Sequence, residues 1–181
     1  MPAGGRQAPQ GRRGRAVRIR PYDAADQSAC VAVVLSQVPR FVLAAEVDGY
    51  ATWLGAECGP SARCMYFVGE EDGAGVVAVG GVSFAETAPV ATLCWGVVRA
   101  GWTGRGLGAQ LLAYRLGLVA ERGAVEEVLL DTTEASVGFF LRAGFRVTGR
   151  VADGYAPGWD RLDLALDLHE WRARSPVPAG R

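Results

Sequence analysis

The chain has 181 residues, of which 50% are hydrophobic and 21% charged, and its formal net charge is zero. These proportions fit one folded domain of about 150 residues with tails, and they exclude collagen-like, mucin-like and wholly disordered chains. The longest unbroken apolar run, residues 29–35, is much shorter than the ~20 residues that a bilayer crossing needs, and no signal-peptide core follows the first arginines, so we expect a cytoplasmic protein without a membrane partner.

The chain begins with a basic segment. Residues 1–20 hold six arginines and no acidic residue, so the rest of the chain carries a net charge of −6. Residues 1–15 lack periodicity, which predicts a disordered Arg-rich tail, and we expect residues 173–181 to form a flexible C-terminus. A basic arm can bind nucleic acid, but no aromatic residue interleaves with these arginines. We therefore expect a solvated tail, common in bacterial reading frames, with nucleic-acid binding by the tail as the less favoured alternative.

The region between the tails, residues 16–172, alternates between strand and helix periods. Alternating or continuous apolar runs predict strands at residues 16–21, 64–70, 76–84, 90–99, 125–131, 145–151 and 161–168. Helical spacing predicts helices at residues 23–38, 41–57, 107–122 and 134–143. Turn residues predict that the second, third and fourth strands form an antiparallel meander. The order β-α-α-β-β-β-α-β-α-β-β indicates an α/β (α+β) fold with a mixed, mainly antiparallel sheet of about seven strands and helices on both faces.

The most informative segment, residues 97–112, reads as the end of a strand, a glycine-rich loop and the start of an amphipathic helix. Gly104, Gly106 and Gly108 let the backbone curl so that successive N–H groups point at one spot, and the helix N-terminus adds a partial positive charge there. This arrangement is suited to a pyrophosphate. The alternative is a glycine-rich turn without a ligand.

The spacing of the glycines excludes two common phosphate-binding motifs. A nucleoside-triphosphate loop requires a lysine, and all 19 cationic residues of this chain are arginines. A dinucleotide fingerprint requires Gly-x-Gly-x-x-Gly after a first parallel strand, whereas this loop reads Gly-x-Gly-x-Gly after the last strand of a meander.

The loop resembles the acyl-CoA-binding motif of the GNAT superfamily of N-acyltransferases, Arg/Gln-x-x-Gly-x-Gly/Ala. Thr103, Gly106 and Gly108 fall on its three fixed positions. Thr103 departs from the motif, and Arg105 inside the loop can supply the missing charge. Residues 135–145, ASVGFFLRAGF, resemble the family's Ala-x-x-x-Tyr/Phe-x-x-x-Gly-Phe helix, and the resemblance covers about residues 16–170.

The resemblance implies an N-acetyltransferase that moves an acetyl group from acetyl-CoA to an amine of a small molecule or peptide by direct attack in a ternary complex. Such an enzyme is an acyltransferase of the class that transfers groups other than aminoacyl groups. It also implies that the strand at 90–99 and the strand that begins at Val125 splay apart to admit the acyl donor. The implied donor-binding residues are Gly96, Val97, Val98, Thr103, Gly104, Arg105, Gly106, Leu107, Gly108, Ala109 and Phe140.

Direct transfer requires a donor for the developing oxyanion and a proton for the departing thiolate. By the resemblance, the oxyanion donor is a backbone N–H near Val98, and Phe140 occupies the position where many members of the family have a tyrosine acid. Phenylalanine cannot donate a proton, but a thiolate with a pKa near 8.5 can leave unaided. Tyr155 is a candidate acid, as is water, and the alternative for Tyr155 is a wall of the substrate pocket.

The attacking amine must also be neutral, which calls for a base or for an amine of lowered pKa. We take Glu86 as the first candidate base, with Glu134 and Asp131 as alternatives. The single histidine, His169, lies near the C-terminus, and the four cysteines are widely spaced. These patterns argue against a Ser-His-Asp triad, a Cys-His protease and a zinc site, so we expect no metal.

The acceptor pocket is expected between the first two helices and the loop around Tyr155. The acidic charge of the folded region favours a cationic amine, and four tryptophans (Trp53, Trp95, Trp102 and Trp159) could wall an aromatic pocket or belong to the core. A non-catalytic acyl-CoA sensor is the alternative to an enzyme. The strand at residues 161–168 could pair across a homodimer if it lies at a sheet edge.

Overall fold

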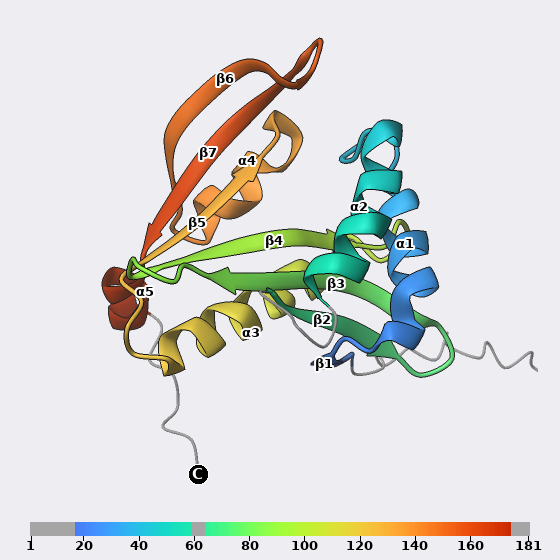
Figure 1. Ribbon diagram of the computed structural model, residues 1–181, viewed down its shortest axis with the longest axis horizontal. Coiled ribbons are helices and arrows are strands. Elements are labelled where there is room, and N and C mark those ends of the chain that lie inside the picture. The colour runs from blue at the N-terminus through green and yellow to red at the C-terminus, as the bar shows by residue number, and fades with distance from the viewer. Residues whose placement is uncertain (1–16, 59–63, 175–181) are drawn as a thin grey trace, which may run out of the picture.

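The computed structural model describes residues 17–58 and 64–174, and a seven-stranded sheet runs through the whole of this part (Figure 1). The strands are β1 (Arg18–Pro21), β2 (Cys64–Glu71), β3 (Gly75–Phe84), β4 (Val90–Val98), β5 (Glu127–Thr132), β6 (Arg146–Ala156) and β7 (Trp159–Asp167). The helices are α1 (Gln27–Leu35), α2 (Ala44–Glu57), α3 (Leu107–Glu121), α4 (Glu134–Arg142) and α5 (Leu168–Arg174), with a 3-10 turn, η1 (Ala24–Asp26), before α1. The predicted tail at residues 1–15 lies outside the described residues.

The strand order is β1-β2-β3-β4-β5-β7-β6, and every neighbouring pair is antiparallel except β4 with β5. This confirms the predicted mixed, mainly antiparallel sheet. The parallel pair is short, because only Val90, Ala91 and Thr92 of β4 are in register with β5. Beyond that point β4 and β5 diverge, and Figure 1 shows them as the two arms of a V.

A β-bulge bends β4 just after it leaves β5. The pairing of β3 with β4 shifts register between Val79 and Gly81, and Trp95 on the opposite strand has a φ of +44°. A bulge inserts an extra residue into one strand and increases its local bend. The sheet therefore opens at the middle of β4.

Helices cover both faces of the sheet, as the sequence predicts. Helices α1 and α2 bury Val34, Tyr50 and Leu54 against one face, where Tyr66 and Val68 of β2 lie. Helices α3, α4 and α5 cover the other face. Buried apolar residues of α3 and α5 form a second core with β3, β4, β5 and β7, and partly buried side chains of α4 pack against it. Each fully buried Leu or Val side chain contributes roughly 1.5–3 kcal/mol of transfer free energy. Each face of the sheet is therefore packed against its own core.

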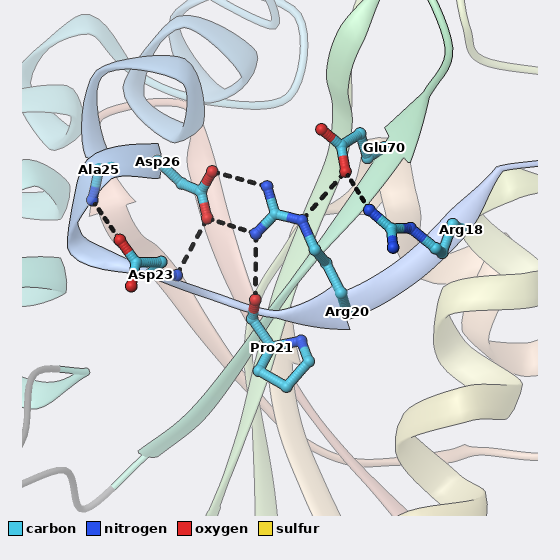
Figure 2. Close-up of polar contacts among 7 residues, drawn as sticks. All are labelled: Arg18, Arg20, Pro21, Asp23, Ala25, Asp26 and Glu70. Carbon is cyan, nitrogen blue, oxygen red and sulfur yellow. Dashed lines mark hydrogen bonds and ion pairs between the residues drawn. The ribbon is translucent and has the colours of Figure 1, made fainter.

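An ion network holds the first strand to the start of α1 (Figure 2). The guanidinium of Arg20 donates to both carboxylate oxygens of Asp26, at 2.7 and 2.8 Å, and its Nε donates to Glu70 on β2 at 3.0 Å. Asp26 also accepts a hydrogen bond from the backbone N–H of Asp23. The Arg20 hydrogen bonds hold the pKa of Asp26 below its usual value, so this carboxylate stabilises the fold in its charged form.

The C-terminal part of the fold differs from the sequence-based expectation in three ways. The predicted loop around Tyr155 is the tip of a long hairpin, because β6 continues to Ala156 and β7 begins at Trp159. Helix α5 was not predicted, and it includes residues 173 and 174 of the expected flexible terminus. Strand β7 lies between β5 and β6, so it is not at a sheet edge, and the condition for pairing residues 161–168 across a dimer is not met.

None of the helices within residues 17–58 and 64–174 is both long enough and apolar enough to cross a membrane.

Candidate functional site

A cavity of about 700 Å³ fills the V between β4 and β5. Its walls come from the second half of β4, the end of β5, the glycine-rich loop, the first turn of α3, helix α4, the α1–α2 connection and the tip of the β6–β7 hairpin. This volume is in the range of small-molecule and cofactor sites. The cavity exists because β4 and β5 stop pairing after Thr92, which leaves space that no strand fills.

One end of the cavity is a loop whose shape requires glycine. Gly101, Gly104 and Gly106 have φ values of +80°, +77° and +81°, and a Cβ added at any of them would meet no atom within 4 Å. Glycine is therefore required by the backbone conformation and not by a steric clash. No side chain of these residues covers the loop. Gly106 is the N-cap of α3, so the first-turn N–H groups of the helix have no carbonyl one turn earlier to bond. A phosphate fits this end of the cavity.

The middle of the cavity exposes the backbone of β4. Arg99 donates its N–H to Val77 of β3, and backbone groups alternate along a strand, so the N–H of Val98 points away from β3 toward the cavity. The carbonyl oxygen of Val98 accepts a hydrogen bond from the side chain of Gln37, which follows α1 and is 5% exposed. The resemblance assigns this stretch of β4, Gly96 to Val98, to the arm of the acyl donor.

One buried polar atom in this cavity lacks a partner. The hydroxyl of Thr133, the N-cap residue of α4, has no hydrogen-bond partner in the described part of the chain. Thr133 lies in the cavity wall. Because leaving a buried hydroxyl unpaired costs about 1–3 kcal/mol, such an atom suggests a hydrogen bond to a bound molecule. The glycine loop, the open edge of β4 and this hydroxyl together fit an elongated ligand such as acyl-CoA.

The other end of the cavity carries acidic and aromatic side chains. The hydroxyl of Tyr155 donates a hydrogen bond to the carboxylate of Asp131, at the end of β5. Burial and this hydrogen bond both raise the pKa of Tyr155, so the phenol keeps its proton. Glu46 in the first turn of α2 also lies in the wall, where its carboxylate accepts from the N–H of Leu43 at 2.8 Å. This end attracts cations.

Most of the donor-binding residues expected from the sequence line the cavity. These are Gly96, Val97, Val98, Thr103, Gly104, Gly106, Gly108, Ala109 and Phe140. Arg105 and Leu107 lie in the same loop and helix turn but are not in the wall, and the guanidinium carbon of Arg105 lies 4.6 Å from the centre of the Trp102 ring. Phe140 packs edge-on against Phe139 and Phe145.

The candidate bases are separated by the fold. Glu86 lies in the connection between β3 and β4, at the end of β4 that is remote from the glycine loop, and it is not in the cavity wall. Glu134 forms an ion pair with Arg150 of β6 at 2.8 Å. Asp131 is the candidate that the structure brings into the cavity, beside Tyr155.

The tryptophans also divide between core and cavity. Trp95 and Trp102 line the cavity. Trp53 stacks on Tyr50 within the core under α2, and Trp159 begins β7 outside the cavity wall. Sequence patterns gave no signal for Gln37, Glu46 or Thr133, because each is a single polar residue whose position depends on chain packing.

The sequence of residues 36–145 matches the family model described as the acetyltransferase (GNAT) family. A comparison with curated proteins finds no match.

Solved structures share the fold. A GNAT-family protein from Desulfovibrio desulfuricans superposes with a TM-score of 0.73 at 21% identity, over 84% of this chain and 99% of that one. A spermidine N-acetyltransferase variant from Vibrio cholerae gives 0.68 at 11% identity, over 87% and 97%. A Salmonella typhimurium protein solved with acetyl-CoA as its cofactor gives 0.65 at 18% identity, over 92% and 98%.

Proposed function

The chain belongs to the GNAT family of acetyltransferases, and from that premise we propose that it transfers an acetyl group from acetyl-CoA to an amine of a small molecule or peptide. One observation carries the proposal. A single cavity has the glycine loop at one end and the carboxylate of Asp131 at the other. Donor and acceptor can therefore meet beside β4 in a ternary complex.

The donor would be held mainly by backbone. The pyrophosphate would lie against the glycine loop and the first turn of α3, and the pantetheine arm would pair with β4 at Gly96 and Val98. Thr133 would give its unpaired hydroxyl to the same arm.

The transfer would use groups that already face the thioester. The N–H of Val98, which points into the cavity, would donate to the oxygen as negative charge develops on it. Asp131 would orient the amine and accept its proton. Tyr155, whose hydroxyl donates a hydrogen bond to Asp131, would position that carboxylate. We therefore assign Tyr155 a positioning role in place of the acid role that the sequence suggested.

The acceptor would be a compact cationic amine. Glu46 and Asp131 provide two carboxylates in the wall, and Phe41 and Trp95 provide apolar and aromatic surface beside them. An ammonium ion gains from both kinds of contact. The structurally similar Vibrio cholerae protein is a spermidine N-acetyltransferase, which makes polyamines one reasonable class to test.

The test is release of CoA thiol from acetyl-CoA across a panel of polyamines, amino acids, aminoglycosides, arylamines and short peptides. We expect turnover with at least one class of amine. The same assay with the Gly106→Val variant, whose acceptor end is unchanged, should show no release of CoA thiol at the same donor concentration. Binding of acetyl-CoA without turnover on any class would favour the sensor alternative, to which the missing hydroxyl at Phe140 is suited.

A further inference from the structure

A buried arginine forms part of the cavity wall. Arg115 lies in the middle of α3, two turns after the helix begins, and is 3% exposed. Charged side chains are rarely buried to this extent unless an opposite charge pairs with them. The position also falls on the inner face of the helix, one turn after the buried Leu111, where an apolar residue would be the ordinary choice.

Two glycines make room for the guanidinium. A Cβ added at Gly80 of β3 would lie 3.0 Å from Nη1 of Arg115, and a Cβ added at Gly96 of β4 would lie 2.8 Å from Nη2. The guanidinium therefore lies directly on the backbone of both strands. This is the part of the sheet where β4 bulges away from β5, and Gly96 itself lines the cavity.

The charge of Arg115 has no carboxylate partner. Its Nε donates to the carbonyl of Leu111 at 3.4 Å and its Nη1 to the carbonyl of Gly81 at 3.3 Å, both long hydrogen bonds. No ion pair within residues 17–58 and 64–174 includes it. The titratable groups that act on it are Cys64, Tyr66 and Cys94. Burial raises the pKa of Tyr66, whereas hydrogen bonds with Cys58 and Cys94 lower the pKa of the Cys64 thiol to about 4, so the anion of the chain that acts on the guanidinium is a thiolate. Arginine keeps its proton even when buried, so the cavity wall contains a positive charge that no carboxylate of the described residues compensates.

Arg115 lies near the part of the cavity where the thioester of a bound donor would be. It follows the first residue of α3, Leu107, by eight positions, which is about 12 Å along a helix axis. A pyrophosphate at the glycine loop would send the pantetheine arm along β4 toward Gly96. The sulfur must therefore lie well away from the loop, on the side where the guanidinium meets β4.

We propose that Arg115 is a catalytic residue that stabilises the thiolate of CoA as it leaves. The inference rests on the proposed function. The amine nitrogen forms a C–N bond to the thioester carbonyl carbon, the C–S bond breaks, and its electron pair leaves on sulfur beside the guanidinium. The amine's surplus proton passes to Asp131 and from there to solvent, so CoA departs as the thiolate.

This assignment explains how the site manages without a side-chain acid. Phe140 has no hydroxyl, and the Tyr155 proton is bonded to Asp131. A fixed positive charge in a water-poor wall lowers the free energy of a nearby anion without donating a proton. Among the described residues the guanidinium has no carboxylate partner in the free protein, and it gains an anionic partner on the donor when the CoA thiolate forms.

The experiment measures the affinity of CoA and of S-methyl-CoA for the whole chain as a function of pH. For the wild type, the affinity for CoA should rise relative to S-methyl-CoA by about tenfold as the pH increases toward the thiol pKa near 8.5, because the bound thiol ionises more readily than the free thiol. Arg115→Met, an uncharged side chain of similar length, should remove this rise and lower kcat, while S-methyl-CoA binds as before. Arg115→Lys should retain part of the rise.

The matched control is Arg122→Gln. Arg122 caps the same helix and lies over the Phe84 ring at 3.8 Å, outside the cavity wall, so the pH-dependent rise should be unchanged. An equal rise in the wild type and Arg115→Met would overturn the inference. Failure of the wild type to bind either ligand would instead contradict the proposed function.

Discussion

The donor end and the acceptor end of the cavity are built in different ways. At the donor end, Gly101, Gly104 and Gly106 adopt positive φ values and present backbone N–H groups. At the acceptor end, Glu46, Asp131 and Tyr155 come from three separate elements and present side chains. A backbone site needs a local motif, whereas a side-chain site needs the assembled fold. The donor can thus be common to many proteins while the acceptor differs.

The largest effect is expected from Gly106→Val. A β-branched residue at φ +81° is strained by roughly 1–2 kcal/mol, and a displaced loop loses charge-assisted hydrogen bonds to phosphate worth about 1.5–3 kcal/mol. We expect acetyl-CoA affinity to fall by about a hundredfold or more in calorimetry. Gly117→Ala, in the same helix where an added Cβ meets nothing, is the control and should bind normally. Unchanged donor affinity in Gly106→Val would show that the loop does not hold the donor.

A substitution at the acceptor end should lower turnover without weakening donor binding. Asp131→Asn keeps the shape of the side chain but removes the charge that orients the amine, so kcat/KM for the acceptor should fall about 30-fold. Acetyl-CoA affinity should stay within twofold of wild type. Tyr155→Phe should reproduce part of the loss, and the double variant should lose less than the product of the two, because both act through one hydrogen bond. Independent, multiplicative losses would contradict the positioning role of Tyr155.

The ion network at β1 joins β1 and β2 to the turn before α1. Asp26→Asn should lower the free energy of unfolding by about 1 kcal/mol at neutral pH, a value reduced because Arg20 is 27% exposed. Since the folded-state pKa of Asp26 lies below its unfolded value, its contribution is present above the unfolded pKa and is lost as the pH falls through the folded pKa. Urea titrations at neutral and acidic pH should show the wild type and variant converging in acid.

The smallest effect is expected from Arg105→Gln. Its guanidinium lies over Trp102 and outside the cavity wall, so it acts on the donor phosphates only through a screened charge. We expect acetyl-CoA affinity to fall two- to threefold at low salt, with the difference disappearing at high salt. A loss as large as that of Gly106→Val would mean that a side chain, and not the backbone, holds the donor.

The sequence predicted the fold well and located the glycine loop, because both depend on local patterns. Apolar periods placed the strands and helices, and the spacing of Gly104, Gly106 and Gly108 identified the loop. Glu86 was chosen as a base from its place after a strand, but the β3–β4 connection lies at the closed end of the V. Nothing local could reveal Arg115, because its burial depends on glycines in two strands that α3 packs against.

The most direct test of the account is calorimetric titration of acetyl-CoA into the wild type, Gly106→Val and Asp131→Asn. The account predicts one site per chain in the wild type, its loss in Gly106→Val and its retention in Asp131→Asn. Absence of binding to the wild type, or equal binding to all three proteins, would contradict the central claim that the cleft between β4 and β5 holds an acyl-CoA donor by its glycine loop.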